Sequence, residues 1–367
     1  MRHAYVRTLD GWRAVAIGAV LLCHGGDAVF SAGGALPSRL LYSLSRRGAL
    51  GVDVFFGISG LLICGRLLEE EHQTGTISLR NFYVRRVFRI LPAAFAYLAV
   101  VGALAAAGII PVRLGGWLSC VFFFRNYMPS SGSGWYTGHF WSLAVEEHFY
   151  LICPGLLLLC GPRRARIVVP LLAIAIAVWR VLDFHSARLS ALLPGPSFYE
   201  RTDVRLDALF WGCWMALTLD APASRDAFRR WLSPFVWTLL AAAYVACVAF
   251  APPMAMMWEA ILIPLLLAGT ILHAGNPAGR ILEHAAVRWI GRISYSLYLW
   301  QQLFLIPHEL NRALGPLQVF PLNLVALMVC AVLSYYALEK PMIAYGRKLL
   351  ESLDRDSFPL AATRAET

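Results

Sequence analysis

Residues 140–159, FWSLAVEEHFYLICPGLLLL, decide the fold because they combine a membrane-spanning length with three adjacent ionisable side chains. About 20 predominantly apolar residues are enough to cross a bilayer as a helix. Glu146, Glu147 and His148 lie inside this stretch, and an acidic group at such a depth costs about 2.5 to 3.5 kcal/mol. Acids that are kept at this cost usually serve a function, so the sequence predicts a membrane bundle with a polar interior.

The rest of the chain has the composition of a membrane protein. Hydrophobic residues make up 59% of the 367 residues, and apolar runs of spanning length recur between short Arg-rich segments. We therefore expect an all-α fold, a polytopic integral membrane helical bundle with about ten transmembrane helices. The predicted spans are roughly 10–29, 48–66, 90–110, 139–160, 167–185, 203–219, 231–250, 258–273, 289–306 and 318–338.

The basic residues predict the orientation of these spans. With ten spans, most of the 32 Lys and Arg residues fall on the side of the N-terminus, so the positive-inside rule places both termini in the cytoplasm. The apolar segment 114–124 is too short to span, and we expect it to lie along the membrane or to dip into it. One membrane domain is predicted over 1–351, followed by a polar tail at 352–367.

Charge and cysteine content exclude several classes of protein. The net charge of +10 is explained by the inner-face excess of Arg, so no nucleic-acid partner is predicted. The eight cysteines lie in or beside apolar segments and form no C-x-x-C pair, which indicates packing rather than a zinc site or a disulfide framework. No metal and no permanently bound cofactor is expected.

The first span places two further ionisable groups on one helix face. Arg13 and His24 are eleven residues apart, a separation that turns a helix by three turns and about 20° with a rise of about 16 Å. Asp10, three residues before Arg13, can pair with it, and Asp27, three residues after His24, can accept a hydrogen bond from its ring. This face either lines a cavity or anchors the helix at the two membrane interfaces.

Charged residues in other spans favour the cavity. Asp53 lies near the outer end of the second predicted span, and Asp207 enters the apolar run of the sixth. Glu146 and Glu147 lie about 100° apart around their helix. One of them can bind an Arg of a neighbouring span while the other faces the cavity, and either assignment fits the sequence.

An arginine cluster begins the third predicted span. Arg85, Arg86 and Arg89 alternate with aromatic and aliphatic residues in the segment 81–92, NFYVRRVFRILP. The cluster either contacts lipid phosphates or grips a phosphorylated cytosolic ligand, for which the planar guanidinium fork is suited. Near the other end of the chain, Ser294 and Tyr298 share a helix face that either packs or forms a wall for a sugar-like or pantetheine-like ligand.

Seven segments in order resemble one known family. They are LDGWRAVAIGAVLLCHGG, GVDVFFGISGLLI, FYVRRVFRILP, WSLAVEEHFYL, RLDALFWG, GRISYSLYLW and LEKP. Together they are similar to the membrane-bound acyltransferase family 3, whose members include bacterial polysaccharide and lipopolysaccharide O-acetyltransferases and macrolide acyltransferases. The resemblance covers nearly the whole chain.

The resemblance implies transfer of an acyl group, usually acetyl from acetyl-CoA, to a hydroxyl of a sugar or another glycosylated acceptor. The family has a pattern of one basic residue, ten intervening positions and then His, which Arg13 and His24 match. Its Arg-x-x-Arg pattern, which is associated with the acyl donor, is matched by Arg86 and Arg89. Its Trp-Ser-Leu-x-x-Glu-x-x-Phe-Tyr pattern is matched by Trp141, Ser142, Leu143, Glu146, Phe149 and Tyr150. The chain departs from many relatives at His148, where they have Gln, and at Gln301, where they have His.

The residues and the resemblance together give a hypothesis for the reaction. Arg85, Arg86 and Arg89 would hold the CoA phosphates at a cytoplasmic mouth, and His24 would act as general base or form a transient acyl-histidine. Asp27 or a Glu of the fourth span would orient His24. The other residues assigned to the site are Arg13, Asp10, Glu146 and Glu147, with Ser142 or Tyr150 as oxyanion donors and Asp53, Trp141 and Asp207 in support.

A proton-coupled transporter of a sugar or organic acid is the alternative function, because intramembrane charges also serve transport. Inverted repeats would favour it, but the two halves of the sequence show no clear similarity. The expected partners are therefore the lipid bilayer, acyl-CoA and a carbohydrate, lipid-linked sugar or glycoside acceptor. The expected location is the bacterial cytoplasmic membrane, which the chain would cross several times.

Overall fold

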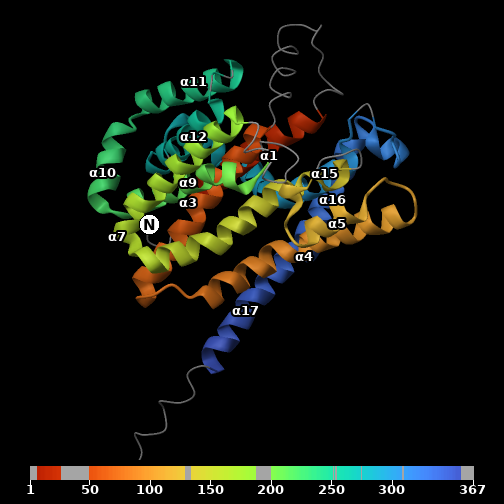
Figure 1. Ribbon diagram of the computed structural model, residues 1–367, viewed down its shortest axis with the longest axis horizontal. Helices are drawn as coiled ribbons and strands as arrows, with labels where there is room; N and C mark the ends of the chain where they lie inside the picture. Colours follow the sequence, from red (N-terminus) through yellow and green to blue (C-terminus); the bar gives the residue numbers. More distant parts are fainter. Residues whose placement is uncertain are drawn as a thin grey trace, which may run out of the picture.

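The computed structural model describes residues 6–25, 49–128, 134–186, 200–250, 252, 254–273, 275–307 and 310–356, and every regular element among them is a helix. Figure 1 shows α3 and α9 in the middle of the bundle, α10 and α11 at one edge, and α17 extending away from the other helices. The helices are α1 (Arg7–Gly25), α3 (Ala49–Thr74), α4 (Leu79–Ala106), α5 (Leu114–Val121), α6 (Trp135–Gly138), α7 (Phe140–His185), α9 (Leu206–Asp220), α10 (Pro222–Trp231), α11 (Pro234–Phe250), α12 (Ala255–Leu272), α13 (Pro277–Leu282), α14 (Ala285–Arg292), α15 (Ser294–Phe304), α16 (Leu322–Ser334) and α17 (Lys340–Asp356). Short 3₁₀ segments are η2 (Arg125–Tyr127), η3 (Thr202–Val204) and η4 (Gly315–Gln318), and η5 (Tyr335–Glu339) is a π-helix between α16 and α17.

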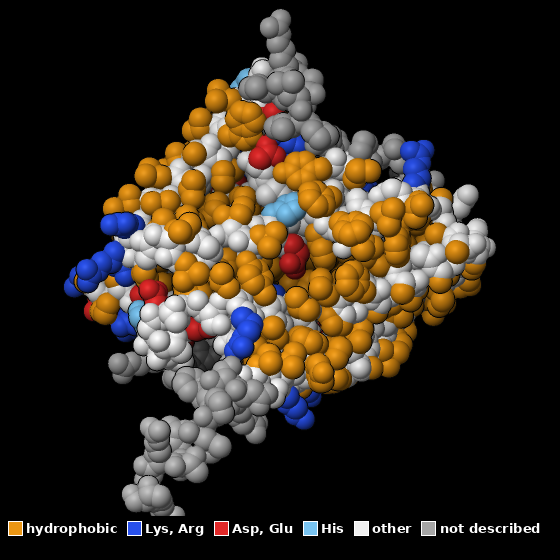
Figure 2. Space-filling view, turned by 60° about the horizontal axis from the view of Figure 1, so that its bottom comes forward, with side chains coloured by type: hydrophobic (Ala, Val, Ile, Leu, Met, Phe, Trp, Pro, Cys, Tyr) orange, Lys and Arg blue, Asp and Glu red, His pale blue; other side chains and the backbone are white. Residues whose placement is uncertain are grey.

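The protein is a multi-pass membrane protein. Within the described residues, five helical stretches are long and apolar enough to cross a membrane, and a sixth is added if α10 and α11, which are bent by 76° at their junction, count as one span. In Figure 2 hydrophobic side chains cover most of the visible face, while Lys and Arg gather at its margins. The all-α membrane fold expected from the sequence is thus confirmed, whereas the expected count of about ten spans is not.

The count is not confirmed for reasons that lie in particular helices. The predicted spans 139–160 and 167–185 both fall in the helical stretch Trp135–His185, which consists of two helices joined by a kink. Gly161 lies at this kink, between the two predicted spans, with φ 65° and ψ 161°, a conformation open to glycine because it has no Cβ. The predicted span 203–219 corresponds mainly to α9, whose 15 residues rise about 22 Å, less than the hydrocarbon thickness of about 30 Å.

Small residues bring the central helices close together. A Cβ added at Gly60 of α3 would lie 2.0 Å from the carbonyl oxygen of Leu209 in α9, and one at Gly212 of α9 would lie 2.4 Å from the carbonyl oxygen of Gly57. Close contact through glycines is typical of helix pairs in membranes, where packing replaces the hydrophobic effect as the driving force. The α3–α9 pair therefore forms a tight centre for the bundle.

We predict that Gly60→Ala destabilises the protein by about 1 to 3 kcal/mol, because α3 and α9 must separate to admit the methyl group. Thermal unfolding in detergent measures the change. Gly65→Ala on the same helix is the control, since no atom lies within 4 Å of a Cβ added there. Equal melting temperatures for the two variants would contradict the tight contact.

Candidate active site

A polar cavity opens between α1, α3, α4, α7 and α15. It encloses about 750 Å³, counting the space that is open to solvent. Its walls are formed by Arg13, Val52, Phe55, Phe56, Ser59, Arg86, Arg89, Ile90, Ser142, Leu143, Glu146, Glu147, Tyr150, Ser294, Tyr295 and Tyr298. Three arginines and two glutamates thus face one space within a bundle of apolar helices.

The start of α4 places two of these arginines. Ser78 precedes the helix and its side chain accepts a hydrogen bond from the Asn81 amide at 3.3 Å, which caps the first turn. Arg86 and Arg89, three residues apart, then fall on the cavity side of α4. The Arg86 guanidinium lies over the rings of Phe82 and Tyr150, at 5.8 and 5.1 Å from their centroids.

The arginines of the cavity are not all paired with carboxylates. Arg13, from α1, contacts Asp10 at 3.5 Å, so the pair expected within the first span is present. Among the described residues, neither Arg86 nor Arg89 lies within 4.0 Å of a carboxylate. Two guanidinium groups are therefore available to an anionic ligand.

Arg85 differs from its neighbours. Its guanidinium forms an ion pair with Glu70 of α3 at 2.6 Å, and it is absent from the cavity wall. The three arginines that the sequence groups together are thus divided, with Arg86 and Arg89 facing the cavity and Arg85 joining α3 to α4.

Both glutamates of α7 line the cavity, and they differ in their partners. Glu146 accepts hydrogen bonds from the hydroxyls of Ser59 at 3.1 Å and Tyr150 at 2.7 Å. Within the described part of the chain, Glu147 has no hydrogen bond or ion pair. Glu146 is therefore fixed in position, whereas the Glu147 carboxylate is available to a ligand.

Two other predicted site residues lie in buried ion pairs away from the cavity wall. Asp207 of α9 receives two hydrogen bonds from the Arg180 guanidinium of α7, both at 2.8 Å. Asp53 of α3 pairs with Arg205, whose guanidinium also lies 5.6 Å from the ring of Trp141. These contacts tie α3, α7 and α9 together.

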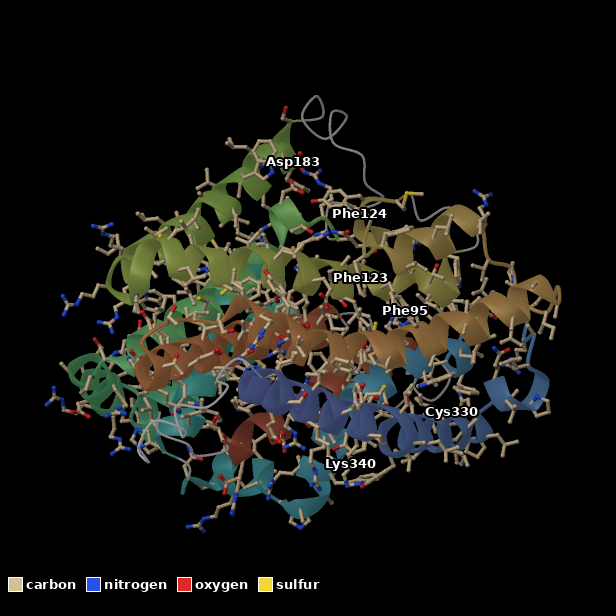
Figure 3. All side chains as sticks on the ribbon, turned by 90° about the horizontal axis from the view of Figure 1, so that it is seen from below. Phe95, Phe123, Phe124, Asp183, Cys330 and Lys340 are labelled. Carbon is tan, nitrogen blue, oxygen red and sulfur yellow. The ribbon has the colours of Figure 1, made fainter. Side chains whose placement is uncertain are left out.

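A third ion pair lies at the far end of α7. Arg201 bridges Asp183 at 2.9 Å and Asp203 at 2.5 Å. Figure 3 shows Asp183 on the opposite side of the molecule from Lys340, the first residue of α17, with Phe124 on the Asp183 side. The buried pairs therefore extend along α7 from the centre of the bundle to this end.

His24 lies at the last turn of α1 and is not part of the cavity wall. Its ring packs edge-on against Trp135 with centroids 5.3 Å apart, and its buried Nδ1 has no hydrogen-bond partner in the described part of the chain. Asp27, which the sequence places beside it, falls outside the described residues. Arg13 therefore lines the cavity from the first half of α1, whereas His24, which the sequence places on the same face, lies at its C-terminal end outside the cavity wall.

Two hydroxyls connect the cavity wall with the region of His24. Ser142 Oγ and Tyr298 Oη lie 2.5 Å apart, and each lies within hydrogen-bonding distance of the His139 carbonyl oxygen, at 3.2 and 3.0 Å. We call these two residues the hydroxyl layer. Ser142 belongs to α7 and Tyr298 to α15, so the layer also joins these helices at the cavity.

Sequence reasoning did not single out His139 or Glu339. His139 stands directly before α7 and is 2% exposed, and the side chain of Glu339 in η5 is bonded to Ser296. An ionisable residue at the edge of an apolar run is the signal that could have identified either of them. His148 on α7 lies outside the cavity wall, and its Nδ1 is bonded to Thr202 Oγ1 at 2.6 Å. Among the described residues no group of three or more His, Cys, Asp or Glu side chains is arranged to hold a metal ion.

We predict that Asp207→Leu destabilises the protein by about 3 to 5 kcal/mol, because the buried Arg180 charge loses its partner. The double variant Arg180→Met, Asp207→Leu removes both charges and is expected to recover most of that loss. Thermal unfolding in detergent compares them. If the double variant were as unstable as Asp207→Leu, the unpaired charge of Arg180 would not be the cause of the destabilisation.

The chain is similar to known acyltransferases over most of its length. A family model described as "Acyltransferase domain" matches residues 6–340. "Putative peptidoglycan O-acetyltransferase YrhL" of Bacillus subtilis is 29% identical over 381 residues, covering 94% of this chain and 56% of the relative. "Peptidoglycan O-acetyltransferase OatA" of Listeria monocytogenes is 29% identical over 327 residues, covering 81% of this chain and 49% of the relative.

A third relative has similar coverage. "Putative O-acetyltransferase SACOL0978" of Staphylococcus aureus is 26% identical over 387 residues, covering 94% of this chain and 58% of the relative. The chain therefore spans about half the length of these curated relatives. No solved structure matches it.

Proposed function

We propose, since the chain belongs to the acyltransferase-domain family, that it is an integral membrane O-acyltransferase. In this proposal it transfers an acyl group, acetyl in the first instance, from acyl-CoA to a hydroxyl of a carbohydrate, lipid-linked sugar or glycoside. The observation that carries the proposal is the cavity in which Arg86 and Arg89 lack a carboxylate partner among the described residues. The names of the relatives support a carbohydrate acceptor.

The arginines of the cavity are proposed to bind the phosphates of CoA. Arginine presents a planar set of donors that matches phosphate oxygens. Arg86 and Arg89 supply such donors from α4, and Arg13 adds positive charge from α1. Arg85 contributes less directly in this scheme, because its guanidinium is occupied by Glu70.

His24 is proposed as the general base. Its imidazole accepts the proton of the acceptor hydroxyl while the hydroxyl oxygen attacks the thioester carbonyl carbon. The resulting tetrahedral intermediate collapses with cleavage of the carbon–sulfur bond, and the departing CoA thiolate takes the proton back from His24. One hydroxyl of the hydroxyl layer of Ser142 and Tyr298 would turn away from the His139 carbonyl and donate to the negatively charged oxygen.

The proposal includes an orientation in the membrane. The distribution of Arg and Lys supports about ten spans with both termini in the cytoplasm of a bacterial cell. The arginine cavity would then take acyl-CoA from the cytosol, and His24 would lie nearer the outer face at the other end of α1. The acyl group would in this way reach an acceptor outside the cytoplasm.

We predict that Arg86→Ala weakens binding of acetyl-CoA by about 10- to 100-fold, as expected when about 1.5 to 3 kcal/mol of charged hydrogen bonding is lost. Isothermal titration calorimetry of the detergent-solubilised protein measures the dissociation constant. Arg230→Ala on α10, where the side chain is exposed, is the control. Equal affinities of the two variants for acetyl-CoA would show that the arginine cavity does not bind the acyl donor.

We predict that His24→Ala abolishes acyl transfer while acetyl-CoA binding is kept, because the hydroxyl loses its base and the arginines remain. The assay follows release of free CoA thiol in the presence of a panel of methyl glycosides. Full transferase activity in a folded His24→Ala protein would rule out this mechanism. A folded wild-type protein that neither binds acetyl-CoA nor releases CoA would contradict the proposed function as a whole.

A further inference from the structure

A second group of buried polar atoms lies beside His24, outside the wall of the arginine cavity. Among the described residues, His24 Nδ1, His139 Nε2 and both polar side-chain atoms of Gln301 have no partner at full hydrogen-bond geometry. Gln301 faces His24, and His24 and His139 lie close enough for their charges to interact. We call these three residues the histidine subsite.

Two residues of the subsite are enclosed, whereas His24 is half-buried. Gln301 has 0% of its surface exposed and His139 has 2%. A buried polar group that lacks a hydrogen bond costs about 1 to 3 kcal/mol, and the Gln301 amide, even where one end interacts with His24, leaves its other end unused among the described residues. Such a concentration of unused hydrogen-bonding groups in one place indicates that a polar ligand completes it.

The contacts of Gln302 determine which nitrogen of His139 carries the proton. Gln302 Oε1 accepts a hydrogen bond from the His139 backbone amide at 3.1 Å and also lies 2.5 Å from the ring Nδ1. Because a backbone N–H can only donate, the Gln302 atom is the amide oxygen, and Nδ1 must donate to it as well. The neutral His139 ring therefore presents an unprotonated Nε2, which accepts a hydrogen bond.

The chemistry of the subsite selects the kind of ligand. His139 Nε2 requires a donor, while the Gln301 amide offers both a donor and an acceptor. A thioester carbonyl only accepts, so it cannot satisfy His139. A hydroxyl donates and accepts, and neighbouring hydroxyls on a sugar ring can satisfy both residues at once.

We propose that His139 and Gln301 bind neighbouring hydroxyls of a carbohydrate acceptor and thereby hold the reacting hydroxyl at His24. This inference rests on the proposed function, because it concerns the acceptor of that same reaction. Gln302 is a positioning residue, since it acts by fixing the tautomer of His139. The subsite adjoins the arginine cavity through the hydroxyl layer, whose two residues hold the His139 carbonyl.

Two variants test the subsite. His139→Phe keeps a ring against Tyr97 and Tyr298 and leaves Gln302 Oε1 bonded to the backbone amide, whereas Gln301→Leu removes the amide at similar volume. Each is expected to weaken binding of a methyl glycoside at least 10-fold. Acetyl-CoA affinity should stay unchanged and both variants should remain folded, with a higher melting temperature for Gln301→Leu because it removes unsatisfied buried groups, and a lower one for His139→Phe because it loses the bond to Gln302. His148→Gln is the matched control, because His148 lies on α7 outside the cavity wall and has its own partner in Thr202.

The measurement is binding of methyl glycosides and of their single-deoxy analogues by isothermal titration calorimetry, without acyl donor. Wild type should bind at least one methyl glycoside more tightly than one of its deoxy analogues, and His139→Phe should lose that preference. Absence of glycoside binding to wild type, or equal binding by wild type and both variants, would overturn the subsite. Glycoside binding that is lost in the variants, together with no acyl transfer by wild type, would uphold the subsite and reject the proposed reaction.

Discussion

A charge inside a membrane bundle must either meet a counter-charge or face a cavity, and this constraint divides the ionisable residues of the protein into two groups. Asp207 meets Arg180 through two hydrogen bonds, and Asp53 meets Arg205. The cavity, by contrast, contains guanidinium groups such as that of Arg86, for which no described carboxylate lies within ion-pair distance. The paired charges hold helices together, and the unpaired charges are those that a ligand can use.

Helix α3 shows how one element serves both purposes. Gly60 faces α9, where an added Cβ would lie 2.0 Å from the Leu209 carbonyl oxygen, and Gly57 faces Ile263 of α12, where it would lie 2.7 Å from a side-chain methyl. Ser59, between them in sequence, turns to the cavity and donates a hydrogen bond to Glu146. The close packing of α3 on α9 thus fixes the position from which Ser59 orients a glutamate of α7. Packing and site geometry depend on the same few residues.

Features that depend on local patterns in the sequence were predicted, whereas contacts between distant segments were not. Helices, their apolar faces and the Asp10–Arg13 pair follow from spacing within a few turns, and all are present. Arg85 was grouped with its neighbours, but Glu70 lies on α3, and no spacing rule indicates that this pair forms across the turn. His139 was missed for the same reason, because its position depends on residues of α15. The number of spans could not be fixed either, because composition does not show where a helix stops short of the membrane thickness, as α9 does after 15 residues.

The hydroxyl layer lies between the proposed binding site for CoA and the proposed binding site for the acceptor. CoA is a large anion that requires the arginines, whereas a sugar is neutral and requires the hydrogen-bonding groups around His24. Ser142 and Tyr298 line the arginine cavity and also hold the His139 carbonyl, so the two proposed sites meet at this layer. Neither substrate then needs to enter the other's site. Only the acyl group has to pass the layer, and the thioester carbonyl would encounter the hydroxyl donors there, where its oxygen becomes negatively charged.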